Sequence, residues 1–380
     1  MIFDLSEEQK MMRKTVRDFA EREVLPRAAE IDEADEFPRD IFRKAADLGL
    51  LAVTLPEEHG GAGADAICSA IASEELGRSS AAVSHICSSV KHHLFCLYHY
   101  GTEAQKRKYL GPLARGEIIG SFALTETNAG SDAAGIAATA ILDGDSYVIN
   151  GNKMFITLGP LADLSIVFAF TDKSKGTKGI SAFIVEKGTS GFAVGKKEKK
   201  LGQRGNPVSE LIFTDCRVSR ENLLGAEGQG LKIALHSLDS GRIEIAALAC
   251  GLIRAALEAS VSYAKKRVQF GQPVANFQLI QSMIAGMASD LEAARLLTYQ
   301  AAYLNDQGRP FTREAAIAKR FATEAAMKHT TNAIQIHGGY GYCQDYPVER
   351  FFRDAKLTQI YEGTNQIQEL VIAREVLKGA

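Results

Sequence analysis

The spacing of apolar residues changes twice along this chain, and that change limits the folds the chain can adopt. Up to about residue 117, apolar side chains such as Met11 and Val16 recur every three to five residues, which is the spacing of one helix face. From about 118 to 228 they gather in short runs typical of β-strands. After 228 the helical spacing returns. Three regions are therefore predicted, at 1–117, 118–228 and 229–380.

The middle region is predicted to form an antiparallel barrel or sandwich. Its strand-like runs lie at 120–124, 138–142, 147–149, 165–170 and 180–185. Asp143-Gly144 and Asn150-Gly151 stand between such runs, and both pairs favour the positive φ angles of tight hairpins.

The last region is predicted to be an antiparallel four-helix bundle. The stretch from 231 to about 268 contains no proline and is expected to form one very long helix. Thr312 is a plausible N-cap for a later helix, and Gly338-Gly339 is a natural C-terminal stop. The fold class is thus α+β and mostly α.

Charge and composition exclude several classes of function. The 44 basic and 46 acidic residues give a formal net charge of -2, which argues against generic nucleic-acid binding and a polybasic membrane surface. No apolar run approaches the roughly 20 residues of a membrane span. The six cysteines form no C-x-x-C pair, which indicates free thiols in a reducing cytoplasm rather than disulfides or a metal site. Ser6 to Gln9 form a capping box with no signal peptide before it, so folded sequence is expected almost from residue 1.

A carboxylate lies beside a turn-forming glycine near the C-terminus. The segment 361–364 places Glu362 between a tyrosine and a glycine, followed by a threonine. Three other segments, at 121–132, 153–157 and 335–342, are built in the same way from Gly, Thr, Gln and aromatic residues. Such residues can grip a planar cofactor that carries phosphates. Taken alone, however, a Glu beside a Gly is more often a helix cap or a surface charge.

Together and in this order, the motifs resemble the acyl-CoA dehydrogenase family over essentially the whole chain. The resemblance implies an acyl-CoA dehydrogenase-like fold, bound FAD, and the introduction of a double bond into a CoA thioester. No amino-acid side chain accepts a hydride, so this reaction needs the cofactor. It also needs a base for the α-proton, and the resemblance assigns that role to Glu362.

The surroundings of the base are assigned by the same resemblance. Tyr361 and Ile360 offer an apolar wall that would strengthen the base, and the N–H of Glu362 would hold the thioester oxygen. Some relatives place the base on a long helix instead, at the position of Gly241, which has no side chain here. Without the resemblance, Asp239 and Arg242 are equally well explained as an i,i+3 ion pair on a solvated helix face. The residues expected to bind substrate are Ser131, Asp239, Arg242, Tyr361 and Gly363.

The flavin is expected to lie between two segments of the β region. By resemblance, Thr125 and the backbone near Leu124 bind the pyrimidine edge, Phe155 packs on the isoalloxazine ring and Thr157 meets flavin N5. Without the resemblance, Phe155 would be ordinary core. The cofactor contacts expected within this part of the chain are Phe122, Leu124, Thr125, Phe155 and Thr157.

Other segments resemble the half of the FAD site that a neighbouring subunit supplies in the family. Arg267 would give a permanent charge to the phosphate oxygens. The sharing implies an obligate homotetramer built as a dimer of dimers. The further residues expected to contact FAD are Arg267, Gln269, Phe270, Gln278, Gln335, Gly339, Thr364 and Gln366.

The acyl group is less well specified. Lys91, His92 and His93 stand where relatives commonly have small polar residues, in a region that lines the acyl tail in the family. Either they meet a polar, cyclic or dicarboxylic acyl group, or they face solvent, and both readings stay open. The remaining pattern fits short or medium acyl chains, linear or branched.

Two other classes of function also stay open. A flavin oxidase or reductase on the same scaffold would transfer its electrons differently, and a non-catalytic protein would only bind flavin or acyl-CoA. Glu362 counts against the second, because binding alone needs no base. The family suggests an electron-transferring flavoprotein as electron acceptor. The expected lack of a signal or transit peptide indicates a bacterial or archaeal cytoplasm as location.

Overall fold

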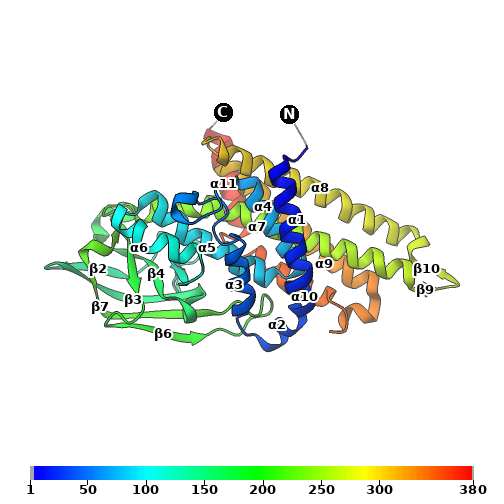
Figure 1. Ribbon diagram of the computed structural model, residues 1–380, viewed down its shortest axis with the longest axis horizontal. Coiled ribbons are helices and arrows are strands. Elements are labelled where there is room, and N and C mark those ends of the chain that lie inside the picture. The colour runs from blue at the N-terminus through cyan, green and yellow to red at the C-terminus, as the bar shows by residue number, and fades with distance from the viewer. Residues whose placement is uncertain (1–3, 379–380) are drawn as a thin grey trace.

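The computed structural model describes residues 4–378 and confirms the order of a helical, a β and a second helical region (Figure 1). The expected lack of a signal peptide rests partly on residues 1–3, which lie outside the described residues. The bounds 1–117, 118–228 and 229–380 stay a prediction.

The N-terminal region is helical. The capping box at Ser6 begins the first helix as predicted: Ser6 Oγ accepts from the Gln9 N–H at 3.2 Å, and Gln9 Oε1 accepts from the Ser6 N–H at 3.0 Å. Val16 is buried but Met11 is 65% exposed, so placing Met11 on the core face is wrong. Five residues turn a helix by about 140° beyond a full turn, which puts Met11 on another face from Val16. The helices are α1 (Glu7–Phe19), α2 (Ala28–Ala34), α3 (Arg39–Asp47), α4 (Ala66–Ser79), α5 (Ala81–Tyr100) and α6 (Glu103–Ala114), with the short helical turns η1 (Ala20–Val24), η2 (Leu25–Arg27) and η3 (Glu57–His59).

The middle region is one eight-stranded sheet within the described residues, in the order β6-β7-β3-β2-β4-β5-β8, with β1 also paired to β4. The sheet is mixed rather than purely antiparallel, because β1 and β2 each run parallel to β4. Parallel neighbours need a crossover, and the β2–β3 hairpin lies within the connection from β1 to β4. The strands are β1 (Gly120–Ala123), β2 (Thr139–Asp143), β3 (Ser146–Thr157), β4 (Leu164–Phe170), β5 (Ile180–Glu186), β6 (Phe192–Lys197), β7 (Val208–Ser219) and β8 (Leu223–Leu224), with the turns η4 (Gly159–Leu161), η5 (Lys173–Gly179) and η6 (Arg220–Asn222).

Only one of the two predicted hairpin turns is a hairpin. Asp143-Gly144 joins β2 to β3, and Gly144 has φ 62°. Asn150-Gly151 instead lies inside β3, where the register with β7 shifts between Ile149 and Gly151. A Cβ on Gly151 would lie 2.8 Å from the Cα of Ala138. The glycine therefore serves a bulge with close backbone approach.

The C-terminal region is built from long helices, and its predicted first helix is present as α7. Thr312 is the first residue of α9 and not its cap, because its Oγ1 donates to Asp239 Oδ2 on α7 at 2.7 Å. Gly338, with φ 62°, ends α9 as predicted. The elements are α7 (Gly230–Lys266), β9 (Val268–Gln269), β10 (Gln272–Pro273), η7 (Val274–Asn276), α8 (Gln278–Asp306), α9 (Thr312–His337), η8 (Gly338–Tyr342), α10 (Val348–Thr358) and α11 (Asn365–Lys378).

Helix α7 is the centre of the molecule. It is the one described helix long and apolar enough to cross a membrane, with a mean hydropathy of 1.5 over its best window, but 67% of that window is buried inside the protein. It packs against α4, α5, α8 and α9. A Cβ on Gly77 of α4 would lie 2.8 Å from the Leu248 carbonyl oxygen of α7, so glycine allows the two helices to approach closely. Helix α5 lies between α7 and β1, which brings all three regions to one place.

Candidate active site

A cavity of about 710 Å³ opens where the three regions meet. It is lined from α5, from the ends of β1 and β3, from α7, and from the loop between α10 and α11. Many of the residues predicted from the sequence are brought together here. They are Phe122, Leu124, Thr125, Ser131, Phe155, Thr157, Arg242, Tyr361, Glu362, Gly363 and Thr364.

Glu362 lies in the loop between α10 and α11 in a left-handed conformation. Its φ is 56°, and that of Gly363 is 85°. Such a conformation costs a non-glycine residue about 1–3 kcal/mol and needs support from its surroundings. Gln368 Nε2 donates to the carbonyl oxygens of Glu362 and Gly363 at 3.2 and 2.9 Å, and Lys319 Nζ donates to the Gly363 carbonyl at 2.9 Å. The loop therefore presents Glu362 in a fixed direction.

The two carboxylate oxygens of Glu362 have different surroundings. Oε1 lies 2.9 Å from His92 Nε2, whereas Oε2 is buried without a hydrogen-bond partner among the described residues. Burial alone would raise the pKa of Glu362, but His92, His85 and Arg242 nearby hold that pKa below its ordinary value. Glu362 lines the cavity, and an ionised carboxylate with one oxygen free of hydrogen bonds is suited to accept a proton.

Gly241, which stands where some relatives carry the base, leaves the space that the Glu362–His92 pair occupies. A Cβ on Gly241 would lie 2.8 Å from Glu362 Oε2 and 2.9 Å from His92 Nε2. A larger residue would therefore collide with both side chains. One position further along α7, Arg242 donates from Nη1 to Asp239 Oδ1 at 2.5 Å, while its buried Nε has no partner among the described residues. Arg242 and Asp239, both predicted to bind substrate, thus form an ion pair on α7 in which Arg242 lines the cavity and Asp239 does not.

Tyr361 is held by a polar layer behind it. Its ring lies edge-on to His85 with 4.6 Å between centroids, and its hydroxyl accepts from Gln203 Nε2 at 3.3 Å. His85 Nδ1 lies 2.8 Å from Gln203 Oε1 and 3.0 Å from Asn206 Nδ2. Burial lowers the pKa of His85 to about 4, so this histidine is neutral at pH 7.

Lys319 supports the loop between α10 and α11 from inside the protein. Its side chain is fully buried and donates to the Gly363 carbonyl and to Asn365 Oδ1, at 2.9 and 2.8 Å. Burial lowers the pKa of Lys319 to about 7, although Glu362 opposes that shift. Lys319 is therefore a partly charged anchor for the turn that carries Glu362.

A second buried pair shapes the wall on the β side. Lys153 Nζ donates to Glu126 Oε1 at 2.7 Å and to the Leu124 carbonyl at 3.0 Å. Glu126 also accepts from the N–H groups of Ala137 and Ala138, at 2.6 and 3.1 Å. Burial lowers the pKa of Lys153 to about 8, against the attraction of Glu126. The pair fixes the loop after β1, which carries Leu124, relative to β3.

Three sequence models of acyl-CoA dehydrogenase domains match the chain in the order of its three regions. The N-terminal domain matches residues 6–117, the middle domain residues 121–216 and the C-terminal domain residues 228–377. The chain belongs to the acyl-CoA dehydrogenase family. These oxidoreductases act on a CH–CH bond and use FAD, which confirms the predicted family, class of reaction and cofactor.

This acyl-CoA dehydrogenase is similar to full-length relatives. Acryloyl-CoA reductase (NADH) of Anaerotignum propionicum is 50% identical over 383 residues, covering 100% of this chain and 96% of the relative. The short-chain specific acyl-CoA dehydrogenase of Clostridium acetobutylicum is 49% identical over 381 residues, covering 100% of each. A chain of the solved structure of the electron transferring flavoprotein of Acidaminococcus fermentans has a TM-score of 0.98 at 48% identity, with 100% of both chains covered.

The cavity of this acyl-CoA dehydrogenase fits the flavin half of FAD. Phe155 lines it with φ 59° and 61% of its surface exposed, so the backbone turns this aromatic ring out of the sheet. A flat ring system stacked on Phe155 would cover that apolar surface. Thr125 and Thr157 lie in the same wall and can supply hydroxyl groups to a flavin edge. The residues present therefore suit the cofactor.

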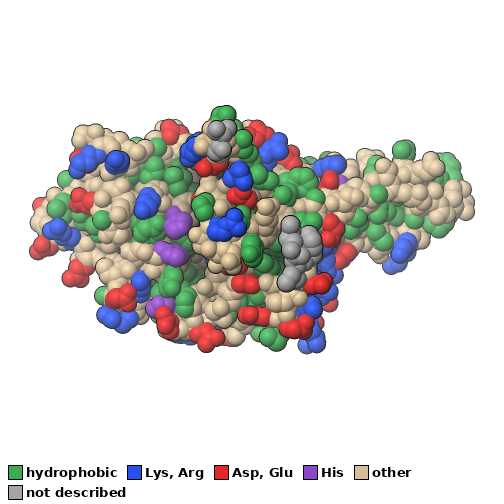
Figure 2. Space-filling model, turned by 90° about the horizontal axis from the view of Figure 1, so that it is seen from above, with side chains coloured by type: hydrophobic (Ala, Val, Ile, Leu, Met, Phe, Trp, Pro, Cys, Tyr) green, Lys and Arg blue, Asp and Glu red, His purple; other side chains and the backbone are tan. Residues whose placement is uncertain are grey.

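The remaining predicted FAD residues lie elsewhere in this acyl-CoA dehydrogenase. The β9–β10 hairpin carries Gln269 and Phe270 at the far end of α7, away from the sheet (Figure 1). Phe270 is 94% exposed, Tyr342 is 87% exposed, and green hydrophobic atoms mark the narrow arm that extends from the body in Figure 2. The predicted FAD residues that do not line the cavity are Arg267, Gln269, Phe270, Gln278, Gln335, Gly339 and Gln366.

Several residues at the site are not predicted from the sequence. His85, Gln203 and Lys319 stand in segments without a motif, and Lys153 begins the segment 153–157 without a predicted role; only burial next to predicted residues reveals all four. No group of three or more His, Cys, Asp or Glu in residues 4–378 is placed to hold a metal ion.

The open question about residues 91–93 is partly settled by the structure. Lys91 Nζ donates to Glu244 Oε2 at 2.7 Å and to Ser69 Oγ at 2.6 Å. His93 is buried against Gly120, and neither ring nitrogen has a hydrogen-bond partner among the described residues. Burial lowers the pKa of His93 to about 3. Because His92 contacts Glu362, none of the three side chains simply faces solvent.

Proposed function

We propose that this enzyme converts a short acyl-CoA to the 2-enoyl-CoA, with Glu362 as the base. The observation that carries the proposal is that Glu362 lines the same cavity as Phe155 and has one carboxylate oxygen, Oε2, without a hydrogen-bond partner among the described residues. Glu362 takes the proton from Cα, and the electron pair of that C–H bond becomes part of the new double bond. FAD supplies the acceptor for the hydride that leaves Cβ.

The backbone of Glu362 can also hold the thioester. Its N–H makes no hydrogen bond to another described backbone group, and Glu362 lines the cavity. An N–H donor to the carbonyl oxygen stabilises the negative charge that develops when the α-proton leaves. Tyr361 and Ile360 line the cavity and help keep water from the reacting carbons.

A short acyl chain is proposed as the substrate. The short-chain specificity of the Clostridium acetobutylicum relative supports this size. Lys91 does not favour a dicarboxylic acyl group, because its ammonium group is already paired with the buried Glu244. Asp239 and Arg242, together with Ser131 and Gly363, are proposed to contact the substrate.

Reduction of a 2-enoyl-CoA is a second candidate for the physiological direction. A relative described as a reductase is 50% identical and one described as a dehydrogenase is 49% identical, so identity does not separate the directions. The same residues would act in reverse, with protonated Glu362 returning a proton to Cα.

The partners are proposed from the same findings. An electron-transferring flavoprotein is the proposed electron acceptor, supported by the similarity to the Acidaminococcus fermentans structure. A homotetramer is supported by the exposed apolar arm and by predicted FAD residues that line no part of their own chain's cavity. A cytoplasmic location fits the six free cysteines, five of them buried.

A chain-length series tests the proposed reaction. The FAD-loaded enzyme is mixed with an artificial electron acceptor and saturated acyl-CoAs of about four to ten carbons, with glutaryl-CoA for comparison. The highest kcat/KM is expected for the shortest chains, because each methylene group that a pocket does not accommodate lowers kcat/KM. Oxidation of glutaryl-CoA alone would contradict the assignment of Lys91. If only the enoyl-CoAs react, with a reduced donor, the reverse direction is established.

Replacing Arg267 tests the sharing of FAD between subunits. Arg267→Ala is expected to weaken FAD binding by about 10- to 100-fold, since a hydrogen bond to a charged group contributes about 1.5–3 kcal/mol. The measurement is the FAD dissociation constant of the reconstituted protein. Arg309→Ala is the matched control, because Arg309 is also exposed but lies in the loop between α8 and α9. Equal FAD affinity in both variants would count against the shared site.

A further inference from the structure

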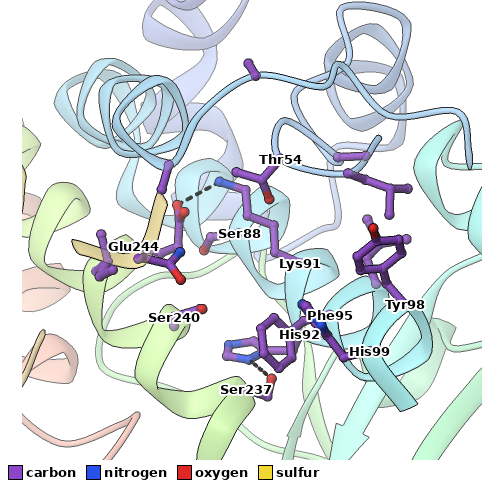
Figure 3. Close-up of a pocket in the computed structure, with 18 of the residues that line it drawn as sticks. Thr54, Ser88, Lys91, His92, Phe95, Tyr98, His99, Ser237, Ser240 and Glu244 are labelled. Carbon is purple, nitrogen blue, oxygen red and sulfur yellow. Dashed lines mark hydrogen bonds and ion pairs between the residues drawn. The ribbon is translucent and has the colours of Figure 1, made fainter. Parts of the chain in front are cut away.

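His92 pairs with Glu362 in the wall of the active-site cavity. The residue lies on α5, and its ring reaches toward α7, where Nδ1 lies 2.9 Å from Ser237 Oγ (Figure 3). Its Nε2 lies 2.9 Å from Glu362 Oε1. The side chains of His92 and Glu362 are only 11% and 13% exposed. One buried imidazole thus joins helix α7 to the carboxylate that serves as the proposed base.

The residues packed around His92 restrict the position of its ring. Gly241 faces the ring, and a Cβ there would lie 2.9 Å from His92 Nε2. His92 also lines a second cavity of about 290 Å³, together with Gly241, Lys91 and Ser237; Figure 3 shows Lys91, His92 and Ser237 there. The ring therefore forms part of the wall between the two cavities, and it cannot be exchanged for solvent without opening that wall.

We propose that His92 is a positioning residue that holds Glu362 Oε1 through its Nε2–H, directs Oε2 at the substrate, and sets the pH range in which Glu362 is a base. This proposal rests on the proposed function of Glu362. The Nε2–H bond does not break in the proton transfer: the α-proton leaves Cα and becomes bonded to Oε2, while Oε1 keeps its hydrogen bond to His92.

The charges around the pair favour a protonated imidazole beside an ionised carboxylate. Burial opposes the charge of His92, but Glu362 and Glu244 raise the pKa of His92 above its ordinary value. The same contact helps to lower the pKa of Glu362. The titratable groups near the pair are His85, Lys91 and His93 on α5, Asp239, Arg242 and Glu244 on α7, Lys319 on α9, and Tyr361 in the loop.

The pH dependence has a definite sign. Glu362 is a base only when ionised, so kcat/KM falls as the pH decreases through the pKa of Glu362. Burial raises the pKa of Glu362, and the positive charge of His92 lowers it. When that charge is lost, the pKa of Glu362 therefore rises. The acid limb of the pH profile of kcat/KM therefore moves to higher pH when His92 is neutral or displaced.

The first test measures the pH profiles of variants. In His92→Gln the amide can still donate to Oε1 but carries no charge, and the acid limb is expected to move up by at least about one pH unit, a tenfold change in the ionisation ratio of Glu362. Gly241→Ala removes no charge but crowds both the His92 ring and Glu362 Oε2, which separates the pair, and it is expected to move the limb in the same direction. His99→Gln is the matched control on an exposed position of α5 and is expected to leave the limb in place.

The second test does not depend on activity. In FAD-loaded enzyme labelled with ¹³C-histidine, one of the eight histidine signals is assigned to His92 by its absence in His92→Gln. That signal is expected to titrate above the ordinary histidine pKa of about 6.5. In Glu362→Gln its pKa is expected to drop by more than about one unit, since the more distant charge of Glu244 is then the main group that opposes burial.

The outcomes separate the two hypotheses. An acid limb that stays in place in both His92→Gln and Gly241→Ala would overturn the role of His92. A His92 pKa that is the same in the native enzyme and in Glu362→Gln would overturn it as well. If no acyl-CoA is oxidised and no enoyl-CoA is reduced by the native enzyme, the proposed function fails. The histidine titration would then still report whether His92 and Glu362 are coupled.

Discussion

Glu362→Gln is expected to lower kcat for acyl-CoA oxidation by about 10³- to 10⁴-fold, the upper part of the range for loss of a general base. Glutamine has the size of glutamate and can keep the hydrogen bond from His92 Nε2, which lies 2.9 Å from Oε1 in the native enzyme. It cannot accept the α-proton at the position of Oε2. The loss should therefore be in catalysis and not in folding or in cofactor binding.

Three quantities decide this prediction when they are measured on the same preparation: the turnover rate with an artificial acceptor, the FAD content and the oligomeric state. The matched control is Glu369→Gln, because Glu369 is exposed on α11 and pairs only with Arg320. Turnover of Glu362→Gln within tenfold of the native rate would contradict the assignment of Glu362. A loss of FAD of the same size would show that the effect is structural.

Lys153→Met is expected to reduce the free energy of unfolding by about 3–5 kcal/mol, because it leaves the buried Glu126 without its charged partner. Glu126 and Lys153 are both buried, with 2.7 Å between Oε1 and Nζ. The variant also removes the donor to the Leu124 carbonyl, so the loop after β1 that lines the cavity loses an anchor. Denaturant unfolding of the FAD-loaded protein measures the change.

Two further variants show whether burial is the cause. Lys196→Met breaks a surface pair with Glu198, in which the lysine side chain is 75% exposed, and is expected to cost less than about 1 kcal/mol. Adding Glu126→Gln to Lys153→Met removes the unpaired charge and should recover part of the lost stability. A cost for Lys153→Met no larger than that for Lys196→Met would contradict the described pair.

The sequence predicts the order of the regions and the residues that carry the family's motifs. Glu362, Phe155 and Arg242 lie in short patterns in which residue type and spacing are readable, and the cavity brings these three together. The long helix after residue 230 is predicted because it contains no proline. Local patterns of this kind need no knowledge of tertiary contacts.

The missed features all depend on contacts between distant segments. His92 meets Glu362 only because α5 packs between β1 and α7. The sequence predicts Thr312 as a helix cap, but in the structure its hydroxyl donates to Asp239 of α7 instead. Gly151 looks like a turn residue, but the close approach of Ala138 to β3 makes it part of a bulge. In each case tertiary packing overrides a valid local preference.

The central claim is that this cavity oxidises short acyl-CoA thioesters, and anaerobic mixing of the FAD-loaded enzyme with butyryl-CoA tests it most directly. The visible flavin absorption is followed, and the thioester product is identified afterwards by mass. We predict that the flavin is bleached and that one 2-enoyl-CoA forms for each flavin reduced. A protein that cannot be loaded with FAD, or a loaded protein whose flavin is neither reduced by a short acyl-CoA nor reoxidised by its enoyl-CoA after chemical reduction, would contradict the account.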